Sequence, residues 1–119
     1  MIYRFNPDTE FEIAERAFIV ELLGSQQDKH CSIARASVKP GVTTALHAVS
    51  ATVERYVILQ GEGDVTVGDR PAERVRALDV VWIGAGEPQK IRNASATEDL
   101  VFLCICTPGF TVESYVHLE

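Results

Sequence analysis

The sequence is poor in cysteine, tryptophan and methionine and has no long hydrophobic run. It contains three cysteines, one tryptophan and one methionine among 119 residues. A small, odd number of cysteines indicates free thiols, as in a reducing compartment, more than a disulfide framework. No apolar run approaches the roughly 18 residues that a membrane-spanning helix needs, and the charged amino-terminal segment lacks the apolar stretch of a signal peptide. We therefore expect a cytoplasmic protein with no membrane partner.

Basic residues are also scarce relative to acidic ones. Eleven Lys and Arg stand against 17 Asp and Glu, which gives a net charge of −6. An acidic chain repels a phosphate backbone, so we expect no nucleic-acid partner. The hydrophobic fraction of 46% and the charged fraction of 24% are typical of globular proteins. At this length the chain predicts a single domain over residues 1–119.

Several motifs that carry chemistry are absent. The glycine-rich segment 61–68 has neither the spacing nor the following helix of a phosphate-binding loop. No serine lies in a nucleophile elbow. Cys104 and Cys106 have no partner pair for a structural zinc site. Their spacing places both on one face of a strand, where they are expected to be small core residues, with a ligand or redox role as the alternative.

Short runs rich in β-branched and aromatic residues alternate with glycine and proline turns along the chain. This pattern is typical of a β-sandwich or a β-barrel. The predicted strands cover residues 17–23, 31–38, 43–49, 55–60, 64–67, 73–78, 79–83, 89–92 and 100–106. Before the first of them, the spacing of Phe11, Ala14, Phe18 and Leu22 fits a helical period, so we expect one helical turn there.

Two segments carry polar residues at regular spacing. In the first, about residues 41–61, Gly41 is followed by five residues and then His47. Val49 comes two residues later, Glu54 follows after four more, and Gly61 after another six. In the second, about residues 79–93, the marked positions are Asp79, Gly84, Gly86, Gln89 and Asn93.

This spacing resembles the two motifs of the cupin superfamily, and the chain looks like a small single-domain cupin, a monocupin, with degenerate metal motifs. The resemblance implies an all-β jelly roll, a barrel closed from two antiparallel sheets. In such a barrel His47, Glu54 and Gln89 would meet although they are distant in sequence. Further lining residues follow from strand alternation: Tyr56 and Ile58 on the face of Glu54, and Ile91 on the face of Gln89.

The same resemblance implies a metal site, and the sequence departs from it. Metal-binding cupins hold a divalent ion with three imidazoles and a carboxylate. Here His47, Glu54 and Gln89 supply one imidazole, one carboxylate and one amide, and Val49 cannot coordinate. This set predicts weak binding of a divalent transition metal such as Mn, Fe, Ni or Zn, with no organic cofactor. The alternative is that the three side chains simply form hydrogen bonds inside the barrel.

Arg35 has two readings as well. It is either a surface charge or a pocket-lining residue that neutralises Glu54 and binds an anionic ligand.

Three functions are compatible with these residues. The first is a metal-dependent enzyme of the dioxygenase, isomerase or decarboxylase kind, acting on a small organic substrate. The alternative is a non-catalytic cupin that binds a sugar or a carboxylate without metal, and the last is a metal-free enzyme with Glu54 or His47 as general base. A fold shared by binders and enzymes does not decide among them. The apolar runs and the amino-terminal segment also predict a homodimer.

Overall fold

The computed structural model describes residues 1–119 and is almost entirely β-structure. Two single-turn 3₁₀ helices, η1 (Pro7–Thr9) and η2 (Val112–Ser114), lie near the chain ends. The strands are β1 (Phe11–Ile13), β2 (Ala17–Leu23), β3 (Ser32–Val38), β4 (His47–Val49), β5 (Val53–Gln60), β6 (Gly63–Val67), β7 (Glu73–Val75), β8 (Val80–Ile83), β9 (Gln89–Asn93), β10 (Leu100–Thr107) and β11 (Tyr115–His117). None of the helices is long and apolar enough to cross a membrane.

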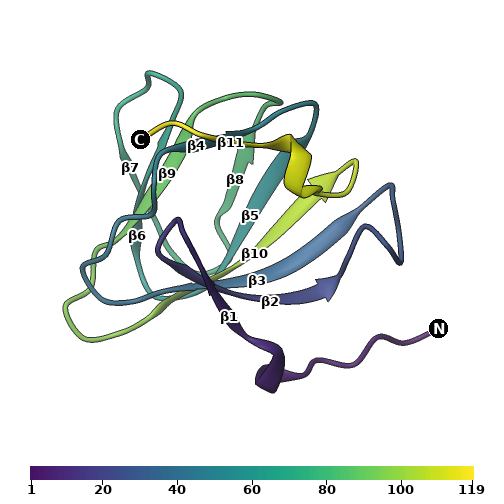
Figure 1. The fold of residues 1–119 in the computed structure, drawn as a ribbon. Helices are drawn as coiled ribbons and strands as arrows, with labels where there is room; N and C mark the ends of the chain where they lie inside the picture. Colours follow the sequence, from purple (N-terminus) through teal and green to yellow (C-terminus); the bar gives the residue numbers. More distant parts are fainter.

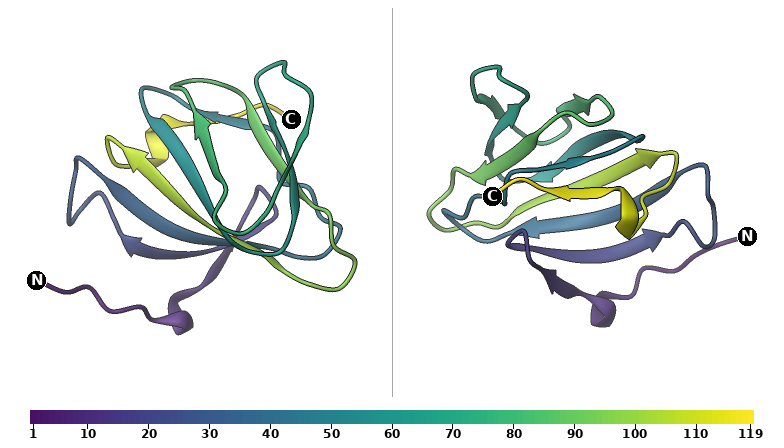
Figure 2. Two further views of the ribbon diagram at one scale, coloured as in Figure 1. Left: turned by 180° about the vertical axis from the view of Figure 1, so that it is seen from behind. Right: turned by 45° about the horizontal axis from the view of Figure 1, so that its top comes forward.

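The strands form two antiparallel sheets that face each other around a common core (Figure 1). The six-stranded sheet has the order β1-β2-β3-β10-β5-β8, and the five-stranded sheet has the order β11-β4-β9-β6-β7. Figure 2 shows the same two layers from behind and tilted so that the top comes forward, with the amino-terminal segment extending away from them. This is the jelly-roll barrel that the sequence motifs predict, so the expected fold class is confirmed.

Alternation along the strands decides which side chains enter the barrel. In β5, Glu54, Tyr56 and Ile58 are buried, whereas Arg55 and Val57 between them are only partly covered. Successive side chains of a strand point to opposite faces, so one set lines the interior and the other faces outward. The core cluster contains Ala17, Ala36, Val38, Tyr56, Ile58, Val65, Val67, Val75, Val81, Ile83, Ile91, Leu100 and Phe102.

Two motif residues shape the barrel and do not carry chemistry. Gly61 has φ +84°, and a Cβ there would lie 2.8 Å from the carbonyl oxygen of Asp99, so only glycine fits this turn. Asn93 is fully buried, and its Nδ2 donates to the carbonyl oxygens of Val38 at 2.9 Å and Glu98 at 2.8 Å. Asn93, the last residue of the second motif, therefore links β9 to the end of β3 and to the loop before β10.

The amino-terminal prediction of a helical turn is wrong. Residues 11–13 form strand β1, which turns back through residues 14–16 and pairs with β2, placing Ile13 opposite Ala17. Arg16 takes the left-handed conformation, with φ 69°, at the end of the turn. A single helical turn leaves most of its backbone donors unpaired, whereas the hairpin pairs them with an existing strand. The carboxyl-terminal strand β11 also escaped the sequence analysis, and the strand expected over 43–49 is reduced to β4.

Candidate functional site: a buried acid–base cluster

His47 lies on β4 with its ring inside the barrel, where only 4% of the residue is exposed. Its Nδ1 is 2.8 Å from the carbonyl oxygen of Ala45. Because a carbonyl oxygen only accepts, Nδ1 is the donor in this contact, and Nε2 is the nitrogen left to face other groups. The ring also stacks on Tyr115 of β11, with centroids 5.3 Å apart. These contacts fix both the orientation and the tautomer of the imidazole.

Glu15 faces the free nitrogen of that imidazole. It comes from the turn between β1 and β2, and its Oε2 lies 3.5 Å from His47 Nε2. Burial raises the pKa of Glu15 to about 7, an effect that a hydrogen bond from the Tyr115 hydroxyl partly offsets. At neutral pH this carboxyl is therefore poised between its two protonation states. The Glu15 carboxylate in turn contributes, after burial, to raising the pKa of Tyr115 to about 12.

A chain of hydrogen bonds joins the two motifs deeper in the barrel. Gln89 of β9 has no exposed surface, and its Nε2 donates to Glu54 Oε1 at 2.8 Å. Its carbonyl oxygen accepts a hydrogen bond from the Tyr56 hydroxyl. Burial raises the pKa of Glu54, while the hydrogen bond from Gln89 and the nearby His47 oppose that rise. The amide therefore has both ends occupied by protein groups.

Two thiols line the same space. On β10, Cys104 pairs in register with Tyr56, and Cys106 pairs with Glu54, so both sulfurs share the interior face of the six-stranded sheet. Burial is the main cause that raises the pKa of each, to about 12 for Cys106, and Glu54 adds to it. The two cysteines share one strand face, as their spacing predicts, and the structure places that face inside the barrel, where both groups are held as neutral thiols.

The sequence-predicted residues occupy different places. His47 pairs in register with Gln89 across β4 and β9. Glu54 lies close enough to both that each of them lowers its pKa, so the three residues form one cluster. Ile58 and Ile91 are fully buried in the apolar core. Arg35 is not brought to the cluster: its guanidinium carbon lies 4.6 Å from the Phe5 ring centroid and its Nη2 lies 3.4 Å from Glu10 Oε2. Of its two readings, the geometry matches the outward one.

Glu15 and Tyr115 are the members that sequence reasoning missed. Glu15 stands beside Arg16 in what reads as an ordinary charged turn, and Tyr115 belongs to a tail without motif spacing. Both reach His47 through pairing of the chain ends. β11 pairs with β4, and the turn before β2 is tied to the segment before β4 by the hydrogen bond from Ala45 N to the Glu15 carbonyl oxygen at 3.0 Å. No local sequence pattern predicts such contacts.

The side chains present do not fit a resident divalent metal. No group of three or more His, Cys, Asp or Glu side chains lies together in an arrangement that could hold an ion. His47 Nε2 faces Glu15, and the Gln89 amide forms hydrogen bonds with Glu54 and Tyr56. Val49, buried two residues after His47 on β4, has no side-chain atom that could bind a metal. The side-chain oxygen and nitrogen atoms that could bind a metal contact one another instead.

Comparison with known proteins agrees with this fold. The cupin domain family model matches residues 34–106, more than half of the chain. The chain therefore belongs to the cupin superfamily. It is 34% identical over 88 residues to the uncharacterized protein MJ1618 of Methanocaldococcus jannaschii, across 74% of this chain and 69% of that protein.

Two solved structures illustrate the range of activities on this scaffold. A predicted oxalate decarboxylase of Thermotoga maritima, TM1287, is 27% identical, with a TM-score of 0.79 over 91% of this chain and 99% of that one. Pac13 of Streptomyces, a nucleoside dehydratase, is 13% identical, with a TM-score of 0.79 over 100% of this chain and 92% of its own. The latter similarity concerns the fold alone.

Proposed function

We propose that this cupin binds a small, polar organic molecule at the end of the barrel where Glu15, His47 and Tyr115 meet, and that the Glu15–His47 pair moves a proton to or from it without a resident metal. The observation that carries the proposal is the 3.5 Å separation between Glu15 Oε2 and His47 Nε2, with Nδ1 held by Ala45. A base oriented by one group and paired with a second is the arrangement that acid–base catalysis needs.

The chemistry follows from the shared proton. When Glu15 is protonated, its proton lies between Oε2 and the lone pair of Nε2, and when His47 takes that proton the carboxylate compensates the new charge. Tyr115 donates to Glu15 and holds its orientation. The pair can thus give a proton to a leaving hydroxyl or accept one from a carbon or oxygen acid. Elimination and isomerisation of small hydroxylated molecules are the reaction classes that fit.

The similarity to a decarboxylase and to a dehydratase supports a small organic substrate and does not choose one. Glu54, Gln89 and Tyr56 would form the deeper wall of the site, and their hydrogen-bonded chain keeps that wall rigid. Because all three cysteines are free, the proposal includes a reducing, cytoplasmic location.

The test is to follow proton transfer directly. The protein is incubated in D₂O with a panel of neutral sugars, nucleosides and small hydroxy acids, and ¹H NMR records exchange or loss of substrate protons. We expect turnover of at least one compound by the wild type and a fall of about 10²- to 10⁴-fold in His47→Asn, the range typical of a lost general acid or base. His30→Asn, at an exposed turn, is the matched control and should react like the wild type.

Metal analysis of protein purified without added metal separates the competing functions. Near-stoichiometric Mn, Fe, Ni or Zn that disappears in His47→Ala, together with activity lost on chelation, would assign the site to a metal enzyme and overturn the proposal. Ligands that raise the melting temperature but never exchange protons would leave a non-catalytic binding protein. A ligand at 100 times its Kd adds about 2.7 kcal/mol of stability, so binding is easily detected.

The partner part of the proposal is a second copy of the chain, docked at the amino-terminal edge. The segment before β1 carries exposed apolar side chains at Ile2, Tyr3 and Phe5, and Phe11 of β1 is half exposed. β1 is also the outer strand of its sheet, so one row of its backbone groups has no partner. Figure 1 shows this segment extending from the body of the protein.

We expect the wild type to sediment as a dimer at micromolar concentration and the Phe5→Glu, Phe11→Glu double variant to sediment as a monomer. Charges at these two positions would oppose burial of the apolar segment. The matched control is Val112→Glu together with Leu118→Glu, at exposed positions near the other end of the chain. A wild type that sediments as a single species of 13.1 kDa would contradict the proposal.

A further inference from the structure

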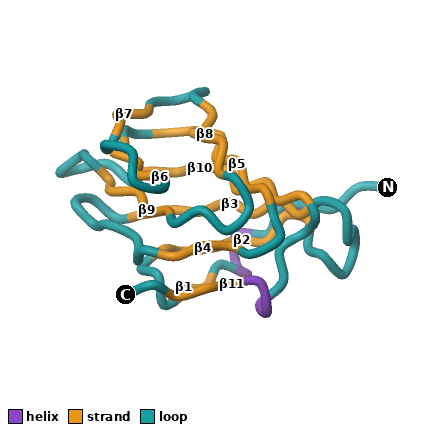
Figure 3. Tube along the Cα trace, turned by 90° about the horizontal axis from the view of Figure 1, so that it is seen from above, coloured by secondary structure: helices purple, strands orange, loops and turns teal.

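A cavity lies on the other side of the barrel from the chain ends, where the two sheets are not joined. The outer strands there are β7 of the five-stranded sheet and β8 of the six-stranded sheet, and they do not pair with each other. Viewed along the barrel, β7 and β8 stand at one end of the stack and β1 and β11 at the other (Figure 3). The opening between β7 and β8 leads to a cavity of about 230 Å³.

The floor of this cavity is apolar. Val65 and Val67 of β6, Val75 of β7 and Val81 of β8 line it, and each of these four side chains is more than nine-tenths buried. An apolar cavity of about 150 Å³ is large enough to bind benzene. The space between the two sheets therefore admits a six-membered ring or a branched aliphatic group, and burial of such a group among valines is favourable.

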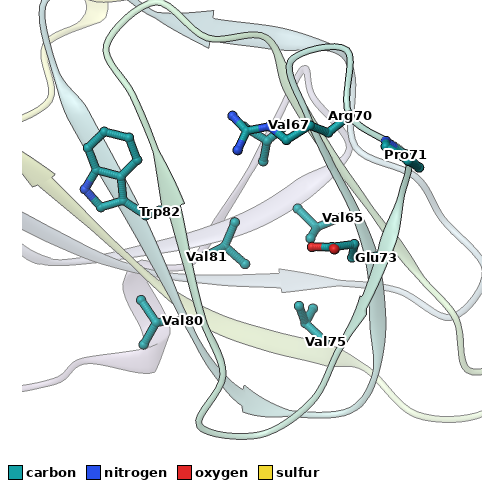
Figure 4. A pocket seen from close by; sticks show the side chains of 9 residues that line it. All are labelled: Val65, Val67, Arg70, Pro71, Glu73, Val75, Val80, Val81 and Trp82. Atoms are coloured by element: carbon teal, nitrogen blue, oxygen red, sulfur yellow. The ribbon is translucent and has the colours of Figure 1, made fainter.

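The rim of the cavity carries one unpaired charge. Glu73 is opposite Val65 in the β6–β7 register, so its side chain leaves the same face of the sheet as that valine. Figure 4 shows its carboxylate directed across the gap toward Val81. No arginine, lysine or histidine of the protein forms an ion pair with it. An acidic group with no internal counter-charge beside an apolar cavity is complementary to an organic cation.

The positive group at the rim is already neutralised. Arg70 also lines the cavity, but its Nη2 is 2.7 Å from Glu87 Oε2. The other carboxylate oxygen of Glu87 accepts a hydrogen bond from Gly84 N at 2.8 Å, which holds the acid in place beside the arginine. An anionic ligand would have to displace Glu87 to reach the guanidinium and would face repulsion from Glu73.

We propose that this cavity between β7 and β8 is a binding site for a small hydrophobic ammonium compound, with its apolar body among the valines and its charged nitrogen at the carboxylate of Glu73. It opens at the opposite edge of the barrel from Glu15 and Tyr115 and does not depend on the activity proposed there, although Val67 pairs with Gln89 and Val81 with Tyr56 at its inner end. The interface proposed for the second copy lies at the opposite edge of the six-stranded sheet and leaves the opening free.

Trp82 makes the proposal directly measurable. It lines the cavity and is the only tryptophan of the chain, so all tryptophan fluorescence comes from one position at the edge of this site. The probes are three compounds with the same ring and different charges: benzylammonium, benzyl alcohol and benzoate. We expect saturable changes in Trp82 emission, with benzylammonium binding about threefold to fivefold more tightly than benzyl alcohol, the range of an exposed ion pair. Benzoate should bind most weakly.

Glu73→Gln isolates the charge. In this variant benzylammonium should lose its advantage over benzyl alcohol, whose own affinity stays unchanged, and added salt should reduce the advantage in the wild type. Glu113→Gln, an exposed acid on η2, is the matched control and should behave like the wild type. Val75→Phe fills the cavity and should weaken all three probes.

Three results would overturn the proposal. The first is that Glu73→Gln binds benzylammonium as tightly as the wild type does. The second is that benzoate binds more tightly than benzyl alcohol, and the third is that no probe shows saturable binding. Glu73 is exposed, so its replacement leaves the fold intact, and the comparison between probes stands even if Val75→Phe proves unstable. Loss of probe binding in His47→Asn would instead show that the two sites are one.

Discussion

Glu15→Gln should remove most of the pH dependence of stability that the wild type shows between pH 5 and pH 9. Burial raises the pKa of Glu15 in the folded protein to about 7, against an ordinary value of 4.5. A carboxyl whose pKa is raised by folding contributes stability that is fully present below the unfolded pKa and is lost as pH rises through the folded pKa. For this shift the loss between pH 5 and pH 9 is about 2 to 3 kcal/mol. The glutamine amide of the variant can still form hydrogen bonds, but it cannot ionise.

The measurement is the free energy of unfolding from urea titrations at several pH values, compared between the two proteins. The curves should meet near pH 5 and diverge as the pH rises, with the variant more stable at pH 9. Glu113→Gln is the control, and its curve should run parallel to that of the wild type. Tyr115→Phe removes the hydrogen bond that lowers the pKa of Glu15, so it should move the wild-type transition to higher pH. Parallel curves for Glu15→Gln would mean that Glu15 is not buried against His47.

Gln89→Leu should cost about 3 kcal/mol of unfolding free energy, although the two side chains are similar in size. Gln89 is fully buried and is the only link between the Glu54 carboxylate and the Tyr56 hydroxyl. Leucine would leave the Tyr56 hydroxyl without its acceptor and the Glu54 carboxylate without its amide donor, and each such buried loss costs about 1 to 3 kcal/mol. Loss of the amide donor would also raise the pKa of Glu54 further. Urea or thermal unfolding measures the loss.

The same substitution at an exposed glutamine provides the control. Gln60→Leu lies at the end of β5, where the amide is solvent-exposed, and should change stability by less than about 0.5 kcal/mol. Adding Tyr56→Phe and Glu54→Leu to Gln89→Leu removes the orphaned groups and should restore most of the stability, since a buried polar network can be replaced by apolar groups at little cost. A loss below about 1 kcal/mol in the single variant would show that water already reaches the amide.

Much of the fold could be predicted because its signals are local. The continuous apolar run over residues 100–106 predicts a strand, and β10 is an inner strand of the six-stranded sheet, between β3 and β5. The glycine at position 61 marks a turn that no other residue fits. Prediction fails in the amino-terminal segment, where Phe11 and Phe18 fit a helical period equally well. Pairing of β1 with β2 overrides that period, because hydrogen bonds to a preformed strand outweigh a single helical turn.

For the site, the sequence by itself, through its resemblance to the cupin motifs, indicated that His47, Glu54 and Gln89 share one barrel interior and that two imidazoles of the family's metal set are missing. Only the tertiary structure decided what takes their place: Glu15 from a hairpin turn and Tyr115 from the last strand complete the contacts of His47. The physical reason is that motif spacing follows strand periodicity, which is a local property of the chain. The pairing of the two chain ends over β4 is a long-range contact that no sequence period encodes.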